Sequence, residues 1–151
     1  AGEQRVLLCG EDVSKEIRRE EVGNMASVTS VYGCVRKKLV SLQQQLAAKE
    51  DVIMDGRDIG TCVLPQAPLK IYLTASVETR AKRRYKELCE KNVTCDLAEI
   101  MKDIEDRDYR DMHREISPLK QAEDAVLVDS SDMTIDEVVT TIITLAKERM
   151  A

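Results

Sequence analysis

Two patterns in the sequence predict an α/β fold with a mostly parallel sheet. Short apolar runs, which are typical of buried strands, recur along the chain. Between them lie longer segments in which apolar residues recur every three or four positions, as they do in amphipathic helices. Strands that alternate with helices favour a parallel sheet covered by helices. The length of 151 residues allows one main core, or a core with a small inserted lobe.

The first 34 residues predict a small, partly irregular lobe. A short apolar run at 5–9 is followed by Gly10 and a polar stretch at 11–18. The pattern becomes regular after Cys34, where four apolar residues recur at helical spacing: Val35, Leu39, Leu42 and Leu46. An amphipathic helix is therefore expected to begin at about Val35 and to end near Lys49.

The remaining chain predicts three strands and three helices. The strands are expected at 52–54, 69–74 and 125–128. The helices are expected at about 77–91, at about 97–114, and from residue 135 onward. Two capping pairs mark the starts of the last two helices: Asp96 with Glu99, and Thr134 with Glu137.

Composition and charge exclude several classes of protein. The 23 Lys and Arg residues against 28 Asp and Glu residues give a net charge of −5, which is the wrong sign for binding a nucleic acid polymer. The absence of Phe and Trp also argues against base stacking on aromatic side chains. No apolar run approaches the length needed to cross a membrane, and the first residues do not resemble a secretion signal. We therefore expect a cytoplasmic protein that binds no membrane.

The cysteines predict reduced thiols with a structural role. They are five in number and scattered, with no C-x-x-C spacing, and His113 is the only histidine. This pattern does not favour a metal site, and cysteine is commonly a small core residue.

Three segments carry candidate chemistry. The first is the turn at 55–60, where Arg57 and Asp58 lie between two glycines after a predicted strand, at the position where α/β sheets bind ligands. A polar turn with a local ion pair explains the same residues. The second is the run 80–86, in which five of seven residues are basic, including Arg83 and Arg84. A solvated helix face explains that run equally well.

The third segment is the helix that contains Arg107, Asp111 and Arg114. Their spacing of four and then three residues puts all three on one side of the helix, where the arginines can bind phosphate. Ordinary surface pairing is the alternative. Together, three arginine sites in a net-acidic chain favour a small phosphorylated substrate over a polymer.

An ordered set of segments resembles bacterial cytidylate kinase over essentially the whole chain. The motifs Asp-Gly-Arg-Asp-Ile-Gly-Thr at 55–61 and Arg-Asp-Tyr-Arg-Asp at 107–111 are the most specific. The other matching segments are 10–14, 16–18, 24–27, 67–71, 74–76, 81–85, 114, 118–119, 122–125 and 129–130.

The resemblance implies a P-loop NTPase-like nucleoside monophosphate kinase, with a parallel sheet, flanking helices and a small inserted lobe. That lobe, which binds the monophosphate, corresponds to residues 1–48. Residues 49–151 then form part of the kinase core and include a mobile lid at about 77–114. The reaction implied is phosphoryl transfer from ATP to CMP or dCMP, with Mg²⁺ carried by the nucleotide and no metal held by the protein. A monomer is expected for the complete enzyme.

The resemblance also implies roles for individual residues. Ser27, Arg36 and Asp58 would recognise cytosine, whose amino donor and ring acceptors suit a carboxylate, an arginine and a hydroxyl. Arg107 and Asp111 would bind the ribose. The catalytic group comprises four arginines, two facing the phosphates and two in the lid: Arg57, Arg114, Arg83 and Arg84. Positioning and charge neutralisation are what such a reaction mainly requires.

One family feature is missing from the 151 residues. The family's glycine-rich loop, G-x-x-x-x-G-K-[ST] or a close variant, binds the phosphates of ATP. None of the six glycines is followed by Lys. The family's strand before that loop lies between the strands expected at 52–54 and 69–74, so we expect the central strand to be missing here. The chain would then be part of a longer kinase, without useful activity by itself.

Two alternatives remain open from the sequence. One is a non-catalytic CMP-binding or interaction module that has lost its ATP site. The other is a structural α/β domain whose charges are only surface pairs.

Overall fold

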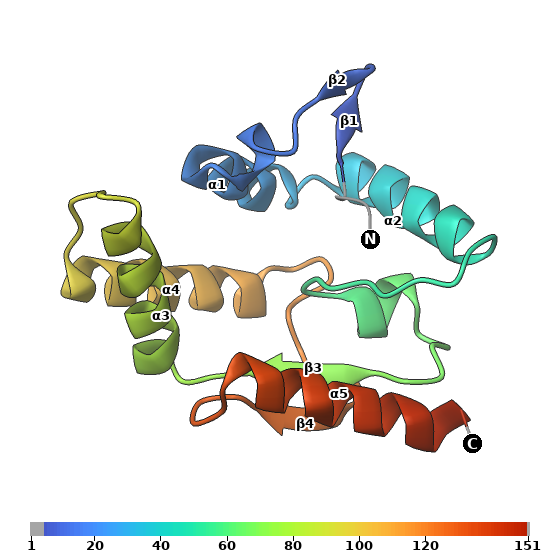
Figure 1. The fold of residues 1–151 in the computed structure, drawn as a ribbon. Helices are drawn as coiled ribbons and strands as arrows, with labels where there is room; N and C mark the ends of the chain where they lie inside the picture. Colours follow the sequence, from blue (N-terminus) through green and yellow to red (C-terminus); the bar gives the residue numbers. More distant parts are fainter. Residues whose placement is uncertain (1–4, 151) are drawn as a thin grey trace.

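The computed structural model describes residues 5–150 and has an N-terminal layer, a two-helix arm and a strand pair with its helix (Figure 1). The N-terminal layer begins with a hairpin of β1 (Leu7–Leu8) and β2 (Glu11–Asp12). A 3₁₀ turn, η1 (Glu16–Arg18), leads into helices α1 (Glu20–Thr29) and α2 (Gly33–Ala47). The helix expected from Val35 is confirmed as α2, whereas α1 lies in the part expected to be partly irregular.

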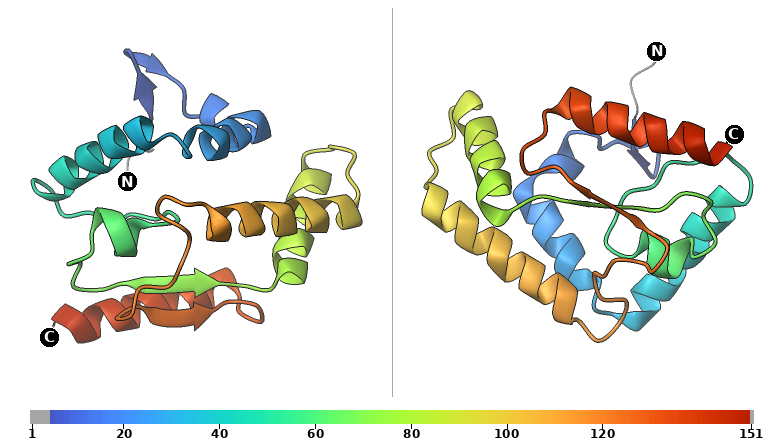
Figure 2. Two further views of the ribbon diagram at one scale, coloured as in Figure 1. Left: turned by 180° about the vertical axis from the view of Figure 1, so that it is seen from behind. Right: turned by 90° about the horizontal axis from the view of Figure 1, so that it is seen from below.

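The strand pair is parallel, as the sequence predicts. In it, β3 (Ile71–Thr74) pairs with β4 (Val126–Asp129), with Ile71 opposite Val126. Helix α5 (Ile135–Met150) runs beside both strands (Figures 1 and 2). The α/β class is confirmed at this level, with two-stranded sheets only among residues 5–150.

The prediction of a strand at 52–54 is wrong. Residues 51–55 form no strand in the structure, and the Ile53 side chain is fully exposed. A strand requires a neighbour to satisfy its backbone N–H and C=O groups. The apolar run has the composition of a strand, but no neighbour pairs with it within residues 5–150.

The arm consists of α3 (Val77–Glu90) and α4 (Leu97–His113), which pack against each other (Figure 1). Ala81 of α3 is completely buried. At the start of α4, the Asp96 carboxylate accepts hydrogen bonds from the backbone N–H groups of Ala98 and Glu99, at 2.8 and 3.0 Å. The predicted Asp96 cap is therefore confirmed.

The cap of α5 is also confirmed, and it is reciprocal. The backbone N–H of Thr134 donates to the Glu137 carboxylate at 2.8 Å, and the backbone N–H of Glu137 donates to the Thr134 hydroxyl at 3.3 Å. This arrangement satisfies two of the N–H groups that a helix start leaves without partners.

The buried core is small for the size of the chain. Among the described residues only four apolar ones are buried: Val63, Ala75, Ala81 and Val128. The accessible surface is 11,865 Å², against about 7,700 Å² for a compact monomer of this mass. Leu73 of β3 and Leu127 of β4 remain more than half exposed. No helix within residues 5–150 is long and apolar enough to cross a membrane.

Candidate functional site

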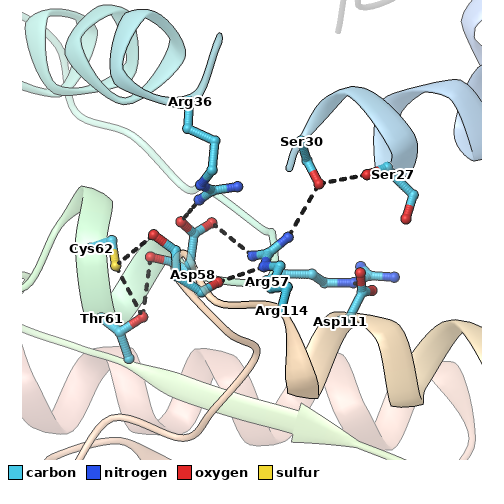
Figure 3. Close-up of polar contacts among 10 residues, drawn as sticks. Ser27, Ser30, Arg36, Arg57, Asp58, Thr61, Cys62, Asp111 and Arg114 are labelled. Atoms are coloured by element: carbon cyan, nitrogen blue, oxygen red, sulfur yellow. Dashed lines mark hydrogen bonds and ion pairs between the residues drawn. The ribbon is translucent and has the colours of Figure 1, made fainter. Parts of the chain in front are cut away.

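Charged residues from three separate segments meet where α2, the turn at 55–63 and the end of α4 come together (Figure 3). Arg36 lies on α2, Asp58 precedes the single π-helical turn η2 (Ile59–Val63), and Arg114 follows α4. The segments are distant in sequence, so packing of the N-terminal layer on the rest of the chain assembles the site.

Asp58 lies between two guanidinium groups. Arg36 Nη2 forms an ion pair with Asp58 Oδ2, and Arg114 Nη2 lies 3.9 Å from Asp58 Oδ1. All three side chains are nearly buried, with exposed fractions of 11% for Arg36 and Asp58 and 9% for Arg114. Burial lowers the pKa of the Arg114 guanidinium, and the positive charge of Arg36 lowers it further. Two guanidinium groups face one carboxylate, so this cluster of three side chains carries a net positive charge.

Within the described part of the chain, three buried arginine N–H groups have no hydrogen-bond partner. They are Arg36 Nε, Arg107 Nε and Arg114 Nη2. A buried donor without an acceptor is costly, and more so on a charged group. A ligand rich in acceptor oxygens or nitrogens would satisfy these donors.

Asp111 connects α4 to the turn at 55–63. Its side chain is 7% exposed and accepts a 3.1 Å hydrogen bond from Arg57 Nε. Arg57 is 44% exposed, so its guanidinium also faces solvent. Arg57 and Asp58 therefore pair with residues of other elements, which contradicts the alternative of a local ion pair within the turn.

Ser30, which the sequence did not single out, links Arg114 to α1. The Arg114 Nη1 group donates to Ser30 Oγ at 3.4 Å, and Ser30 Oγ donates to the Ser27 carbonyl at 2.7 Å (Figure 3). Arg114 Nε donates to the Ser117 carbonyl at 2.6 Å. Ser30 follows Ser27 by three residues, so helical spacing was the one available signal.

A cavity of about 310 Å³ opens beside the Arg36–Asp58 pair. Its wall includes polar and apolar side chains from α1 and α2, among them Thr29, Ser30, Leu39 and Gln43. Apolar walls with a few polar groups suit a small heterocycle. A second cavity, of about 430 Å³, lies at the start of α5 beside Asp132, Asp136 and Glu137, where the acidic charge disfavours phosphate.

The basic run on α3 has different partners. Arg83 Nη2 donates to the backbone carbonyls of Ser130 and Met133, at 2.6 and 3.2 Å. Arg84 Nη1 pairs with Glu87 at 3.0 Å. Arg80 makes two hydrogen bonds to the Asp108 carboxylate, so it joins α3 to α4.

Comparison with known proteins gives a consistent set of matches. The family model described as cytidylate kinase matches residues 1–148. The chain is 52% identical to the cytidylate kinase of Lactobacillus johnsonii over 148 residues, covering 98% of this chain and 64% of that protein. It is 55% identical to the cytidylate kinase of Lactobacillus gasseri over 138 residues, covering 91% of this chain and 60% of that protein. It is 52% identical to a cytidylate kinase of Streptococcus pneumoniae over 149 residues, covering 99% of this chain and 67% of that protein. The chain thus spans about three-fifths to two-thirds of the length of these relatives.

Proposed function

The chain belongs to the cytidylate kinase family, and from this premise we propose that the protein binds CMP or dCMP and serves phosphoryl transfer from ATP to that nucleotide. The observation that carries the proposal is the nearly buried Asp58 carboxylate, held between Arg36 and Arg114 at the wall of the 310 Å³ cavity. A carboxylate and an arginine at one cavity wall offer both an acceptor and donors to a base edge.

We assign the base to this cavity. The exocyclic amino group of cytosine would donate to the Asp58 carboxylate, while ring N3 and O2 would accept from Arg36 and Ser27. Asp58 and Arg36 line the cavity, and Ser27 follows the lining residue Ala26 on α1. The unpartnered Nε of Arg36 supports the assignment, because a base acceptor would satisfy it. Uracil presents an acceptor where cytosine presents the amino donor, so UMP should bind poorly.

The sugar and phosphate would lie toward α4. Arg107 and Asp111 are the proposed ribose partners, and Arg57 and Arg114 the proposed phosphate partners. The buried Nη2 of Arg114, which makes no hydrogen bond, and the half-exposed guanidinium of Arg57 support this direction. Bidentate guanidinium groups suit a phosphate that must be held in one orientation.

Arg83 and Arg84 remain proposed donors to the transferring phosphoryl group from the lid. Arg83 would first have to release the Ser130 and Met133 carbonyls. Such a release is a conformational change of the kind that lids undergo during closure.

The 151 residues do not fit the phosphates of ATP by themselves. They contain no G-x-x-x-x-G-K-[ST] motif. Among residues 5–150 there is no cluster of three or more His, Cys, Asp or Glu side chains that could hold a metal ion. We propose that Mg²⁺ arrives bound to ATP. We therefore propose that the 151-residue chain binds CMP and that phosphoryl transfer requires an additional glycine-rich segment beside β3. The missing motif equally favours a second candidate, a CMP-binding module without kinase activity.

Titration calorimetry with CMP and UMP tests the binding proposal. We expect CMP to bind more tightly than UMP by tenfold or more, and Asp58→Asn to abolish most of that preference, by about 1–3 kcal/mol. Asp55→Asn is the matched control, because Asp55 belongs to the same turn and is exposed. Equal affinities for CMP and UMP would refute the assignment of the base site.

Kinase activity is tested separately by incubating the 151-residue chain with ATP, Mg²⁺ and CMP and quantifying CDP by anion-exchange chromatography. The proposal expects no CDP above a protein-free control. CDP formation would show that an ATP site exists without the glycine-rich motif. With the glycine-rich segment supplied in the same polypeptide, CDP formation separates the kinase from the non-catalytic module.

A further inference from the structure

Gln44 connects helix α2 to the turn that carries Asp58. Gln44 Nε2 donates a 3.0 Å hydrogen bond to the Val63 carbonyl, the last residue of η2. Arg36, Val40 and Gln44 are spaced by four residues, so they lie on one face of α2. That face therefore makes two contacts with the turn, about two helical turns apart: Arg36 contacts Asp58, and Gln44 contacts Val63.

The Val63 carbonyl needs this partner because of its place in η2. Carbonyls in the last turn of a helix find no N–H donor within the helix. Val63 is only 2% exposed, so solvent has little access to this residue. The amide of Gln44 satisfies the carbonyl from a neighbouring helix.

Two hydrogen bonds in series lead from Gln44 to Asp58. Gln44 holds the Val63 carbonyl, and the Val63 N–H donates to the Asp58 carbonyl at 3.2 Å. The Cys62 N–H donates to the same Asp58 carbonyl at 2.8 Å. The backbone of Asp58 is thus fixed by the turn that Gln44 holds at its other end.

The two contacts on α2 are separated by eight residues, or about 12 Å along the helix axis. On the α4 side the turn is held by the Arg57–Asp111 and Asp58–Arg114 ion pairs, and on the α2 side by Arg36. The second contact with α2, at Val63, sets the orientation of the turn relative to α2, and with it the direction of the Asp58 carboxylate.

We propose that Gln44 is a positioning residue for Asp58 and thereby a determinant of the preference for CMP over UMP. The inference rests on the proposed function, because it takes Asp58 as the group that recognises the cytosine amino group. Gln44 itself acts on the far side of the turn, through the peptide of Val63.

The chain provides a matched control next to Gln44. Gln45 Nε2 donates to Ser41 Oγ at 3.1 Å on the exposed side of α2. Gln44→Leu and Gln45→Leu therefore make the same chemical change at two exposed positions of the same helix, one that bonds to the turn and one that bonds only within α2. Gln44→Glu preserves the size of the side chain but replaces the N–H donor with an acceptor.

The experiment measures dissociation constants of the 151-residue chain and its variants for CMP, UMP and ribose 5-phosphate, which lacks the base. We expect Gln44→Leu and Gln44→Glu to weaken CMP binding about 5- to 10-fold, which corresponds to the loss of one hydrogen bond. The CMP-to-UMP affinity ratio should fall by the same factor. The dissociation constant for ribose 5-phosphate should change less than about twofold in the Gln44 variants. Gln45→Leu should have the wild-type dissociation constants for all three ligands.

The outcomes separate the two proposals. If the wild type binds CMP and UMP equally, the base assignment fails, and the role of Gln44 fails with it. If the wild type prefers CMP and Gln44→Leu keeps the wild-type ratio, only the role of Gln44 is overturned. An equal loss for ribose 5-phosphate would also overturn it, because Gln44 would then support the whole site.

Hydrogen exchange of the Val63 amide gives a readout that needs no ligand and covers the case in which Gln44→Leu does not fold. In Gln44→Glu, exchange at Val63 should be at least about tenfold faster than in Gln45→Leu, because the end of the turn has lost its contact with α2. Equal exchange rates in these two variants would overturn the proposal.

Discussion

Removing the carboxylate of Asp58 should destabilise the chain far more than removing a surface carboxylate. Asp58→Asn removes the carboxylate shared by Arg36 and Arg114, which are 11% and 9% exposed, so Arg36 loses its ion-pair partner. An uncompensated buried charge costs about 3–5 kcal/mol. The Coulomb energy of the Arg114–Asp58 pair at 3.9 Å is about 4 kcal/mol at an effective dielectric constant of 20. We therefore expect Asp58→Asn to lower the free energy of unfolding by about 3–4 kcal/mol.

A double-mutant cycle with Arg36→Met makes this prediction sharper. Arg36→Met should cost less, about 2 kcal/mol, because Asp58 keeps Arg114 as a partner. In the double variant neither member of the pair remains, so its cost should be about 2 kcal/mol less than the sum of the single costs.

The assay is urea unfolding followed by far-ultraviolet circular dichroism. Glu78→Gln is the control, since the Glu78–Lys82 ion pair is about 60% exposed on both sides, and it should leave the urea midpoint unchanged. Strictly additive effects of Asp58→Asn and Arg36→Met would refute the reasoning. A midpoint for Asp58→Asn equal to that of Glu78→Gln would refute it as well.

Two further predictions concern the helices. Ala81→Leu should lower the free energy of unfolding by about 1–3 kcal/mol, because Ala81 is completely buried in α3; an unchanged urea midpoint would contradict this. The hydrogen bonds from the Thr134 backbone and hydroxyl hold the pKa of Glu137 below its ordinary value of 4.5. Stability from this contact is present above pH 4.5 and lost as the pH falls through the lowered pKa. Wild type should therefore be more stable than Glu137→Gln at pH 7, and a difference that persists unchanged to pH 2 would contradict the cap.

The helices were predictable because their stabilising interactions are local. The periodicity that begins at Val35 produces α2, and the Asp96 and Thr134 caps mark the starts of α4 and α5. Each of these signals involves residues within a few positions of one another. The short helix α1 was missed because Gly23 and Asn24 weaken its helical pattern.

The strand at 52–54 shows the limit of local patterns. Its composition is that of a strand, but a strand depends on a neighbour elsewhere in the chain. The strands at 69–74 and 125–128 were predicted by the same criterion and do pair with each other. Composition alone did not separate these cases.

By itself the sequence determined the order of helices α2 to α5, the caps of α4 and α5, and the motifs that identify the family. Only the tertiary structure decided which charges meet: Asp58 with Arg36 and Arg114, Arg57 with Asp111, and Arg80 with Asp108. The physical reason is that helical hydrogen bonds join residues four positions apart, whereas these ion pairs join residues of different elements. Partner choice among many arginines and carboxylates follows from the packing of α2 and α4 around the turn at 55–63.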